Sequence, residues 1–131
     1  MVAHVILIVE SDKHAGKLFK SCIEQGGYRA VTANNIEDAL NLTRMWDPDL
    51  VVVDQSLSNH GADRLIEDLV RQPAGRPRIV LTTFETPRPT SALAAHADAV
   101  IAKPLSRERL TSLVGLLLED QSGFIPVPAA E

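Results

Sequence analysis

Residues 4–12 read HVILIVESD, in which five large apolar residues are followed by Glu10, Ser11 and Asp12. Strands of a parallel sheet that are covered by helices on both faces are near-continuous apolar runs of this kind. The run therefore predicts a buried parallel strand. Two carboxylates directly after such a strand need a chemical explanation, because charged groups are costly beside a buried segment.

Four further segments have strand length and strand composition, and helical periods separate them. They are rich in β-branched residues, and two or more are nearly as apolar as the first: YRAVTA (28–33), DLVVVD (49–54), RIVLTT (78–83) and ADAVIA (97–102). Strands that alternate with helices favour right-handed crossovers and a doubly wound sheet. We expect an α/β fold with a five-stranded parallel sheet and helices on both faces.

Apolar residues at helical spacing predict the helices that cover the sheet. A short Ala-rich segment, residues 90–96, is interpreted as one more helix. Asn34 with Glu37 resembles a capping box, and Gly26, Gly27 and Pro48 are helix-stop signals. The predicted buried faces are Ala15, Leu18, Phe19, Cys22 and Ile23; Ile36, Ala39, Leu40 and Thr43; Leu65, Ile66, Leu69 and Val70; and Leu110, Leu113, Val114 and Leu117.

Length and charge limit the function classes that this chain can have. Its 131 residues fit one domain, which we place at residues 1–120, followed by a flexible C-terminal tail at 121–131. The formal charge of −4 and the scattered basic residues argue against direct nucleic-acid binding. There is no basic leader, and no segment approaches the roughly 20 apolar residues of a membrane span. We therefore expect a soluble, cytoplasmic protein that acts on other proteins.

Polar side chains follow four of the predicted strands. Glu10, Ser11 and Asp12 come after the first, Asp54 ends the third, Thr82 and Thr83 end the fourth, and Lys103 follows the fifth. The carboxyl ends of parallel strands meet at one edge of the sheet, where ligands of doubly wound folds bind. Carboxylates suit Mg²⁺, and a hydroxyl with an ammonium suits the oxygens of a phosphoryl group. The sequence therefore predicts a site for a phosphorylated aspartate.

These residues together resemble the receiver domain of two-component response regulators, whose fold is flavodoxin-like. The resemblance covers about residues 5–118 and rests on ILIVESD (6–12), PDLVVVD (48–54), IVLTT (79–83) and AKPLS (102–106). It implies that Asp54 accepts a phosphoryl group from the histidine of a sensor kinase or phosphotransfer protein. It also implies that Thr82 and Lys103 contact that group and that the Lys103–Pro104 peptide bond is cis. The implied cofactor is Mg²⁺.

The chain departs from the family pattern at several positions. Receivers usually place two adjacent acids after the first strand, whereas the second of these positions is Ser11, and Asp12 comes one place late. Ser58 stands where a proline is usual, and Gly61 comes one place early, so we expect a loop one residue short. Val100 replaces the aromatic switch residue, so we expect the signal to pass through Thr82 and the loop with Phe84 and Pro87.

These departures leave several alternatives open. Asp12 is interpreted as the N-cap of the next helix rather than as a metal ligand. Weak Mg²⁺ binding is expected at Glu10, Asp54 and the carbonyl group of Ser56. The loss of one carboxylate also leaves open a pseudo-receiver that works as a docking module without phosphorylation.

Rivals from other classes fit the residues less well. A Mg²⁺-dependent phosphatase with an aspartyl nucleophile would need a second aspartate two residues on, whereas Gln55 and Ser56 follow Asp54. A flavin or nucleotide carrier would need a phosphate-binding loop, and ESDKH (10–14) is acidic. We therefore expect a regulator rather than an enzyme. In the family the output face lies at about residues 90–118, which would contact a downstream protein or a second copy of the chain.

Overall fold

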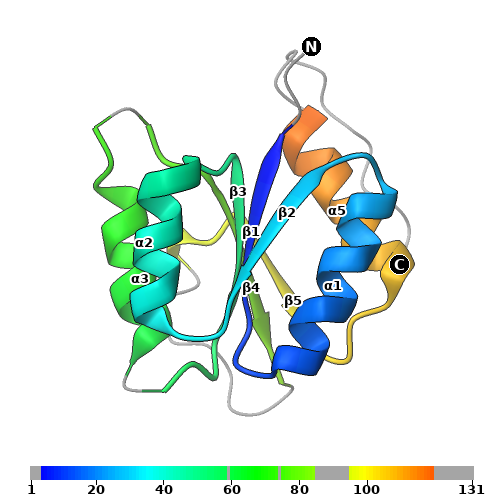
Figure 1. Ribbon diagram of the computed structural model, residues 1–131, viewed down its shortest axis with the longest axis horizontal. Helices are drawn as coiled ribbons and strands as arrows, with labels where there is room; N and C mark the ends of the chain where they lie inside the picture. The colour runs from blue at the N-terminus through cyan, green and yellow to red at the C-terminus, as the bar shows by residue number, and fades with distance from the viewer. Residues whose placement is uncertain (1–3, 59, 74, 85–94, 120–131) are drawn as a thin grey trace.

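The computed structural model describes residues 4–58, 60–73, 75–84 and 95–119. Within these residues, parallel strands form one sheet in the order β2-β1-β3-β4-β5 (Figure 1). This is the predicted five-stranded parallel sheet, and its strand order reverses at β1 and β3, which are neighbours. The strands are β1 (Val5–Val9), β2 (Arg29–Ala33), β3 (Leu50–Asp54), β4 (Arg78–Thr83) and β5 (Ala99–Ala102).

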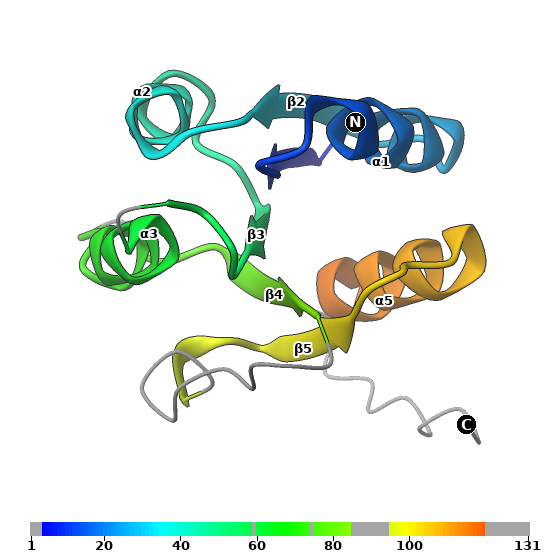
Figure 2. The ribbon, with the colours of Figure 1, turned by 90° about the horizontal axis from the view of Figure 1, so that it is seen from below.

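Helices cover both faces of the sheet, as the alternating pattern predicted. Figure 2 shows α1 and α5 on one face and α2 and α3 on the other. Their bounds are α1 (Lys13–Gln25), α2 (Ile36–Trp46), α3 (Gly61–Val70) and α5 (Arg107–Glu119). The helix expected at 90–96 lies mostly outside the described residues, as does the proposed tail at 121–131; Ala95 and His96 are helical.

The two layers of helices create two apolar cores. One core joins alternate side chains of β1 and β3, such as Leu7 and Val51, to the buried faces of α2 and α3. The other joins the intervening residues, such as Ile8 and Val52, to α1 and α5. Both faces of the central strands are therefore buried, which explains why their sequences are apolar throughout rather than alternating.

Two local expectations were wrong. The N-cap of α2 is Asn35 rather than Asn34, because Asn35 Oδ1 accepts a hydrogen bond from Asp38 N at 2.8 Å. The expected capping pair was Asn34 with Glu37, and the observed pair, Asn35 with Asp38, lies one residue later. Leu18 was expected on the buried face of α1, yet it is 63% exposed. No helix among the described residues is both long and apolar enough to cross a bilayer.

Candidate functional site

The polar residues that follow the strands meet at one edge of the sheet, as expected. Asp54 lies beside Thr82 in the register of β3 and β4, and Lys103 N donates to Thr83 O at 2.7 Å. Glu10 directly follows β1, whose last residue, Val9, is level with Val53. Glu10, Asp54 and Thr82 are all buried, and Asp54 is only 1% exposed. Strand register alone therefore brings a carboxylate pair, a hydroxyl and an ammonium together.

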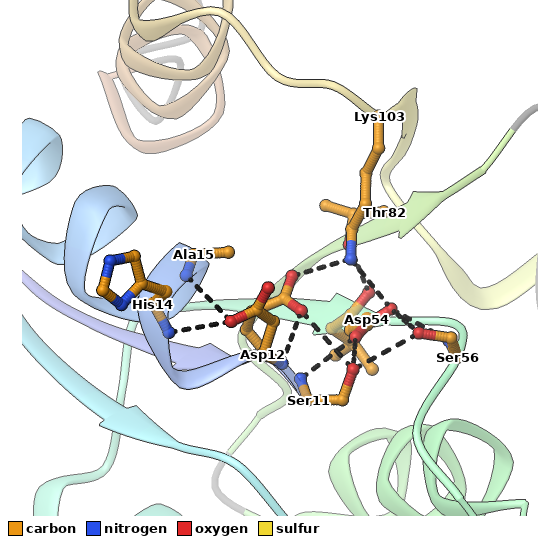
Figure 3. A network of polar contacts seen from close by, with 10 residues as sticks. Ser11, Asp12, His14, Ala15, Asp54, Ser56, Thr82 and Lys103 are labelled. Atoms are coloured by element: carbon orange, nitrogen blue, oxygen red, sulfur yellow. Dashed lines mark hydrogen bonds and ion pairs between the residues drawn. The ribbon is translucent and has the colours of Figure 1, made fainter.

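The Asp54 carboxylate is surrounded by donors from two loops (Figure 3). Its Oδ2 atom accepts hydrogen bonds from Ser11 N at 3.0 Å and Ser11 Oγ at 2.6 Å. Its Oδ1 atom accepts from Ser56 N at 2.9 Å and Ser56 Oγ at 2.7 Å, and Lys103 Nζ is 3.2 Å from the same oxygen. Both carboxylate oxygens are thus held in place by short, charge-assisted contacts.

These contacts determine the ionisation of Asp54. Burial by itself raises the pKa of a carboxyl group, but the hydroxyl and backbone hydrogen bonds from Ser11 and Ser56 favour the charged form. The hydrogen bonds prevail, and they hold the pKa of Asp54 well below its usual range. At neutral pH the group is a carboxylate, which is the form that can act as a nucleophile.

Glu10 is the second buried carboxylate of the site. Its Oε1 atom lies 2.8 Å from Lys103 Nζ and accepts no other hydrogen bond within the described residues. Its Oε2 atom accepts from Asp12 N at 3.0 Å. Burial raises the pKa of Glu10 above its usual value, and Lys103 opposes that shift. Lys103 therefore lies between two carboxylates and offsets the charge of both.

The side chain of Asp12 caps α1. Its Oδ1 atom accepts hydrogen bonds from His14 N at 2.9 Å and Ala15 N at 3.5 Å (Figure 3). These are two of the backbone donors that have no partner inside the helix. The geometry agrees with the interpretation of Asp12 as an N-cap.

Replacing Asp12 by alanine is expected to lower the free energy of unfolding by about 1 kcal/mol, because the first turn of α1 loses its cap. Mg²⁺ affinity should be unchanged. Urea denaturation and calorimetric Mg²⁺ titration measure the two effects, and Asp12→Asn, which keeps the cap, is the matched control. A marked loss of Mg²⁺ affinity in Asp12→Ala would instead make Asp12 a metal ligand.

Thr82 and Lys103 are the other predicted site residues that lie beside the carboxylates. Thr82 Oγ1 is 3.5 Å from Val53 O, a weak contact that leaves the hydroxyl free to turn. The Lys103–Pro104 peptide bond is cis, the geometry that the resemblance implies. Val100 is 46% exposed on β5, and Pro87 lies outside the described residues.

The oxygen ligands at this site fit a hard divalent cation, but only two of them are carboxylates. Mg²⁺ is commonly held by one or two carboxylates, with phosphate oxygens and water completing its shell. Glu10 and Asp54 supply two carboxylates, but no group of three or more His, Cys, Asp or Glu side chains suited to a metal occurs in the described part of the chain. Glu10 Oε1 and Asp54 Oδ1 both contact the Lys103 ammonium, so a cation would compete with it.

Sequence reasoning missed two features of the site. Ser11 was treated only as a departure from the acidic pair and Ser56 only as a carbonyl ligand, whereas the hydroxyl groups of both donate to Asp54. Ser56 lies two residues after the aspartate, a spacing that favours local hydrogen bonds, whereas the bond from Ser11 joins residues far apart in the sequence and has no local signal. The ring of Phe84 also lies 5.0 Å from Lys103 Nζ, and no pattern in the sequence indicated this contact.

Comparison with known proteins agrees with this geometry. The sequence-family model for the response regulator receiver domain matches residues 6–115. This chain belongs to that family. Receiver domains act in phosphorelay signalling with histidine kinases or phosphotransfer proteins, and they generally bind Mg²⁺ at an acidic pocket. They are signalling modules in general rather than enzymes.

The chain matches very different shares of its relatives' lengths. The chain is 30% identical over 117 residues to the phosphate regulon regulator PhoB of Escherichia coli, matching 86% of this chain and 51% of PhoB. It is 29% identical over 118 residues to the polar-differentiation regulator DivK of Brucella anthropi, matching 88% of this chain and 96% of DivK.

Solved structures show the same receiver fold. A CheY-like receiver domain from Methanospirillum hungatei superposes with a TM-score of 0.80 at 22% identity, over 93% of this chain and 98% of that one. The chain spans about half the length of several curated relatives, such as PhoB and the nisin regulator NisR of Lactococcus lactis.

Proposed function

We propose that this receiver accepts a phosphoryl group on Asp54 from the histidine of a sensor kinase or phosphotransfer protein. The observation that carries the proposal is the state of Asp54, which is buried, held ionised and placed within 3.2 Å of the Lys103 ammonium. A carboxylate in these surroundings is oriented for attack and has a fixed positive charge beside the developing phosphoryl charge.

Transfer forms a bond between an Asp54 oxygen and phosphorus and breaks the bond between phosphorus and the donor imidazole nitrogen. The released imidazole takes its proton from solvent. Attack requires one oxygen of Asp54 to lose donors, and the Ser11 and Ser56 hydroxyl groups can rotate to do so. Lys103 and Thr82 then bind phosphoryl oxygens. Thr82 can turn toward the phosphoryl group because its hydroxyl gives up only a weak contact with Val53 O.

Mg²⁺ would be held by Glu10, Asp54 and the Ser56 carbonyl, and it would neutralise charge on the phosphoryl oxygens. Its binding is weak, because Ser11 supplies no charge and Lys103 already contacts both carboxylates. Lys103 would therefore supply more of the positive charge beside the phosphoryl group than it would in a receiver with a third carboxylate and a tightly bound Mg²⁺.

The second candidate is a docking module that works without phosphorylation. It is favoured by one observation: among the described residues, Asp54 has four hydrogen-bond contacts and one ion pair, so it needs no cation for its charge to be compensated. In both candidate functions the signal would pass to another protein by direct contact. The match to nearly the whole of DivK supports that proposal, since a receiver can account for most of a regulator's length.

Incubation with acetyl phosphate, a small phosphoryl donor, distinguishes the two candidates. We expect wild-type protein to gain one phosphoryl group by intact-mass measurement, with Mg²⁺ present, and Asp54→Asn to gain none. The asparagine variant keeps the size of the side chain and serves as the matched control. Label that persists in Asp54→Asn would refute the assigned acceptor, and unlabelled wild-type protein would favour the docking module.

A further inference from the structure

Two large apolar side chains that remain exposed lie at one place on the surface. Leu18 on α1 is 63% exposed, and Phe84, directly after β4, is 54% exposed. Both line a cavity of about 470 Å³. The other large apolar side chains that are exposed within the described residues do not line it; they are Met45, Val100 and Leu116. Exposed apolar residues that gather in one hollow, rather than singly, indicate a contact surface.

Most residues that line this cavity are apolar. They come mainly from α1 and from the segment between β5 and α5, and together they define the apolar groove: Ala15, Leu18, Phe19, Phe84, Pro104 and Leu105. The polar residues that line the cavity include Ser11, Ser56 and Lys103, which contact Asp54. The apolar groove therefore adjoins the candidate site.

The segment that follows α5 has a composition that matches this groove. Residues 120–131 read DQSGFIPVPAAE, with the apolar run FIPV at 124–127. The chain has only three phenylalanines: Phe19 and Phe84 line the groove, and Phe124 begins this run. The run and the groove are thus complementary in their apolar and aromatic character.

Prolines prepare the same run for binding in a groove. Ile125 and Val127 each precede a proline, and a residue before proline is restricted to extended conformations. A segment that is extended beforehand loses less conformational entropy when it docks. Extended segments with alternating prolines bind grooves lined by aromatic side chains in many proteins. The groove therefore fits an extended, proline-containing apolar segment.

The length of chain after α5 is sufficient to reach the groove. α5 has 13 residues and is therefore about 20 Å long. Leu105 lies just before its first residue, whereas residue 120 follows its last. Residues 120–127 can span about 26 Å when extended. Because α1 and α5 share one face of the sheet (Figure 2), a chain that turns back along α5 brings residues 124–127 to the groove.

We propose that residues 124–127 turn back along α5 and occupy the apolar groove, with the ring of Phe124 against Leu18 and Leu105. A short tether gives an effective concentration on the order of millimolar, so even a weak groove is occupied. A protein that binds this surface beside Asp54 must then displace the segment. The proposal concerns a contact within the chain and does not depend on phosphoryl transfer.

Nuclear magnetic resonance on the full chain tests the contact directly. We expect nuclear Overhauser effects between the ring protons of Phe124 and the methyl protons of Leu18 and Leu105. Phe124→Ser should abolish them and move both leucine methyl resonances downfield, because protons over a ring face resonate upfield. A wild-type Phe124 ring without these effects would overturn the proposal.

A change in the groove provides the reciprocal test. Leu18→Lys places a charge in the groove at an exposed helical position, and the Phe124 ring resonances should shift to those of a solvated phenylalanine. Met45→Lys is the matched control, because Met45 is 75% exposed on α2 and does not line the groove. Phe124 resonances that respond to both variants alike, or to neither, would refute the assigned groove. Contacts that weaken on dilution would assign the segment to a second copy of the chain and refute the contact within one chain.

Discussion

Replacing Lys103 by methionine is expected to lower the free energy of unfolding at neutral pH by about 3–5 kcal/mol. The substitution keeps most of the apolar stem of the side chain but leaves Glu10 and Asp54 as two buried carboxylates without their shared counter-charge. Removing one partner of a buried ion pair is costly because the remaining charge has lost both its water and its partner. Urea denaturation followed by Trp46 fluorescence measures the loss.

The loss should depend on pH in a defined direction. Folding raises the pKa of Glu10, so its contribution favours the folded state at low pH and disappears as the pH rises through the raised value. Without Lys103 the pKa of Glu10 rises further, because the ammonium opposes the shift. The deficit of Lys103→Met should therefore shrink as the pH falls from about 7 toward the ordinary glutamate value of about 4.3.

Asp54 works in the opposite sense. Folding lowers its pKa, so its contribution is present above the ordinary aspartate pKa of about 3.9 and is lost as the pH falls below it. The donors from Ser11 and Ser56 remain in the variant, so most of this behaviour should be unchanged. The loss of unfolding free energy in Lys103→Met should therefore decrease between neutral pH and about pH 4.3 because Glu10 becomes protonated.

A double variant provides the control. Glu10→Gln combined with Lys103→Met removes the charge that lost its partner, and it should recover a large part of the stability and the pH dependence. A deficit in Lys103→Met that is under about 1 kcal/mol, or independent of pH, would mean that the ammonium does not offset the buried carboxylates.

The sheet and the edge that holds the site were predictable because parallel strands have a simple sequence signature. β4 was predicted at its observed bounds, and β1, β2 and β3 within one residue. Once these strands are parallel, Glu10, Asp54, Thr82 and Lys103 must end at the same edge. No knowledge of individual side-chain contacts is needed for that step.

Features that depend on single hydrogen bonds or on exposure were harder to predict. Asn34 and Asn35 are chemically identical candidates for the N-cap of α2, and only the backbone geometry selects Asn35. Leu18 follows the helical spacing of α1 but lies beyond the edge of its buried face. The donor roles of Ser11 and Ser56 depend on hydroxyl directions that composition does not specify.

Ser11 is the departure with the greatest expected consequence for the metal. Replacing it by aspartate should increase Mg²⁺ affinity on the order of 10- to 100-fold, because a third full charge joins the two buried carboxylates of Glu10 and Asp54. Isothermal titration calorimetry gives the affinity, and the amide shifts of residues 11 and 56 report where the cation binds. Without Mg²⁺ the same variant should be less stable than wild type, since the new carboxylate replaces a hydroxyl donor to Asp54.

Ser11→Asn is the matched control, because it has the shape of aspartate without the charge. It should lose the hydroxyl bond to Asp54 and gain no metal affinity, so any gain in Ser11→Asp must come from the charge. Mg²⁺ should then stabilise Ser11→Asp against urea more than it stabilises wild type, since stabilisation by a ligand that binds the folded state increases with the logarithm of its affinity. Equal Mg²⁺ affinities in wild type, Ser11→Asn and Ser11→Asp would show that the cation does not bind beside Glu10 and Asp54.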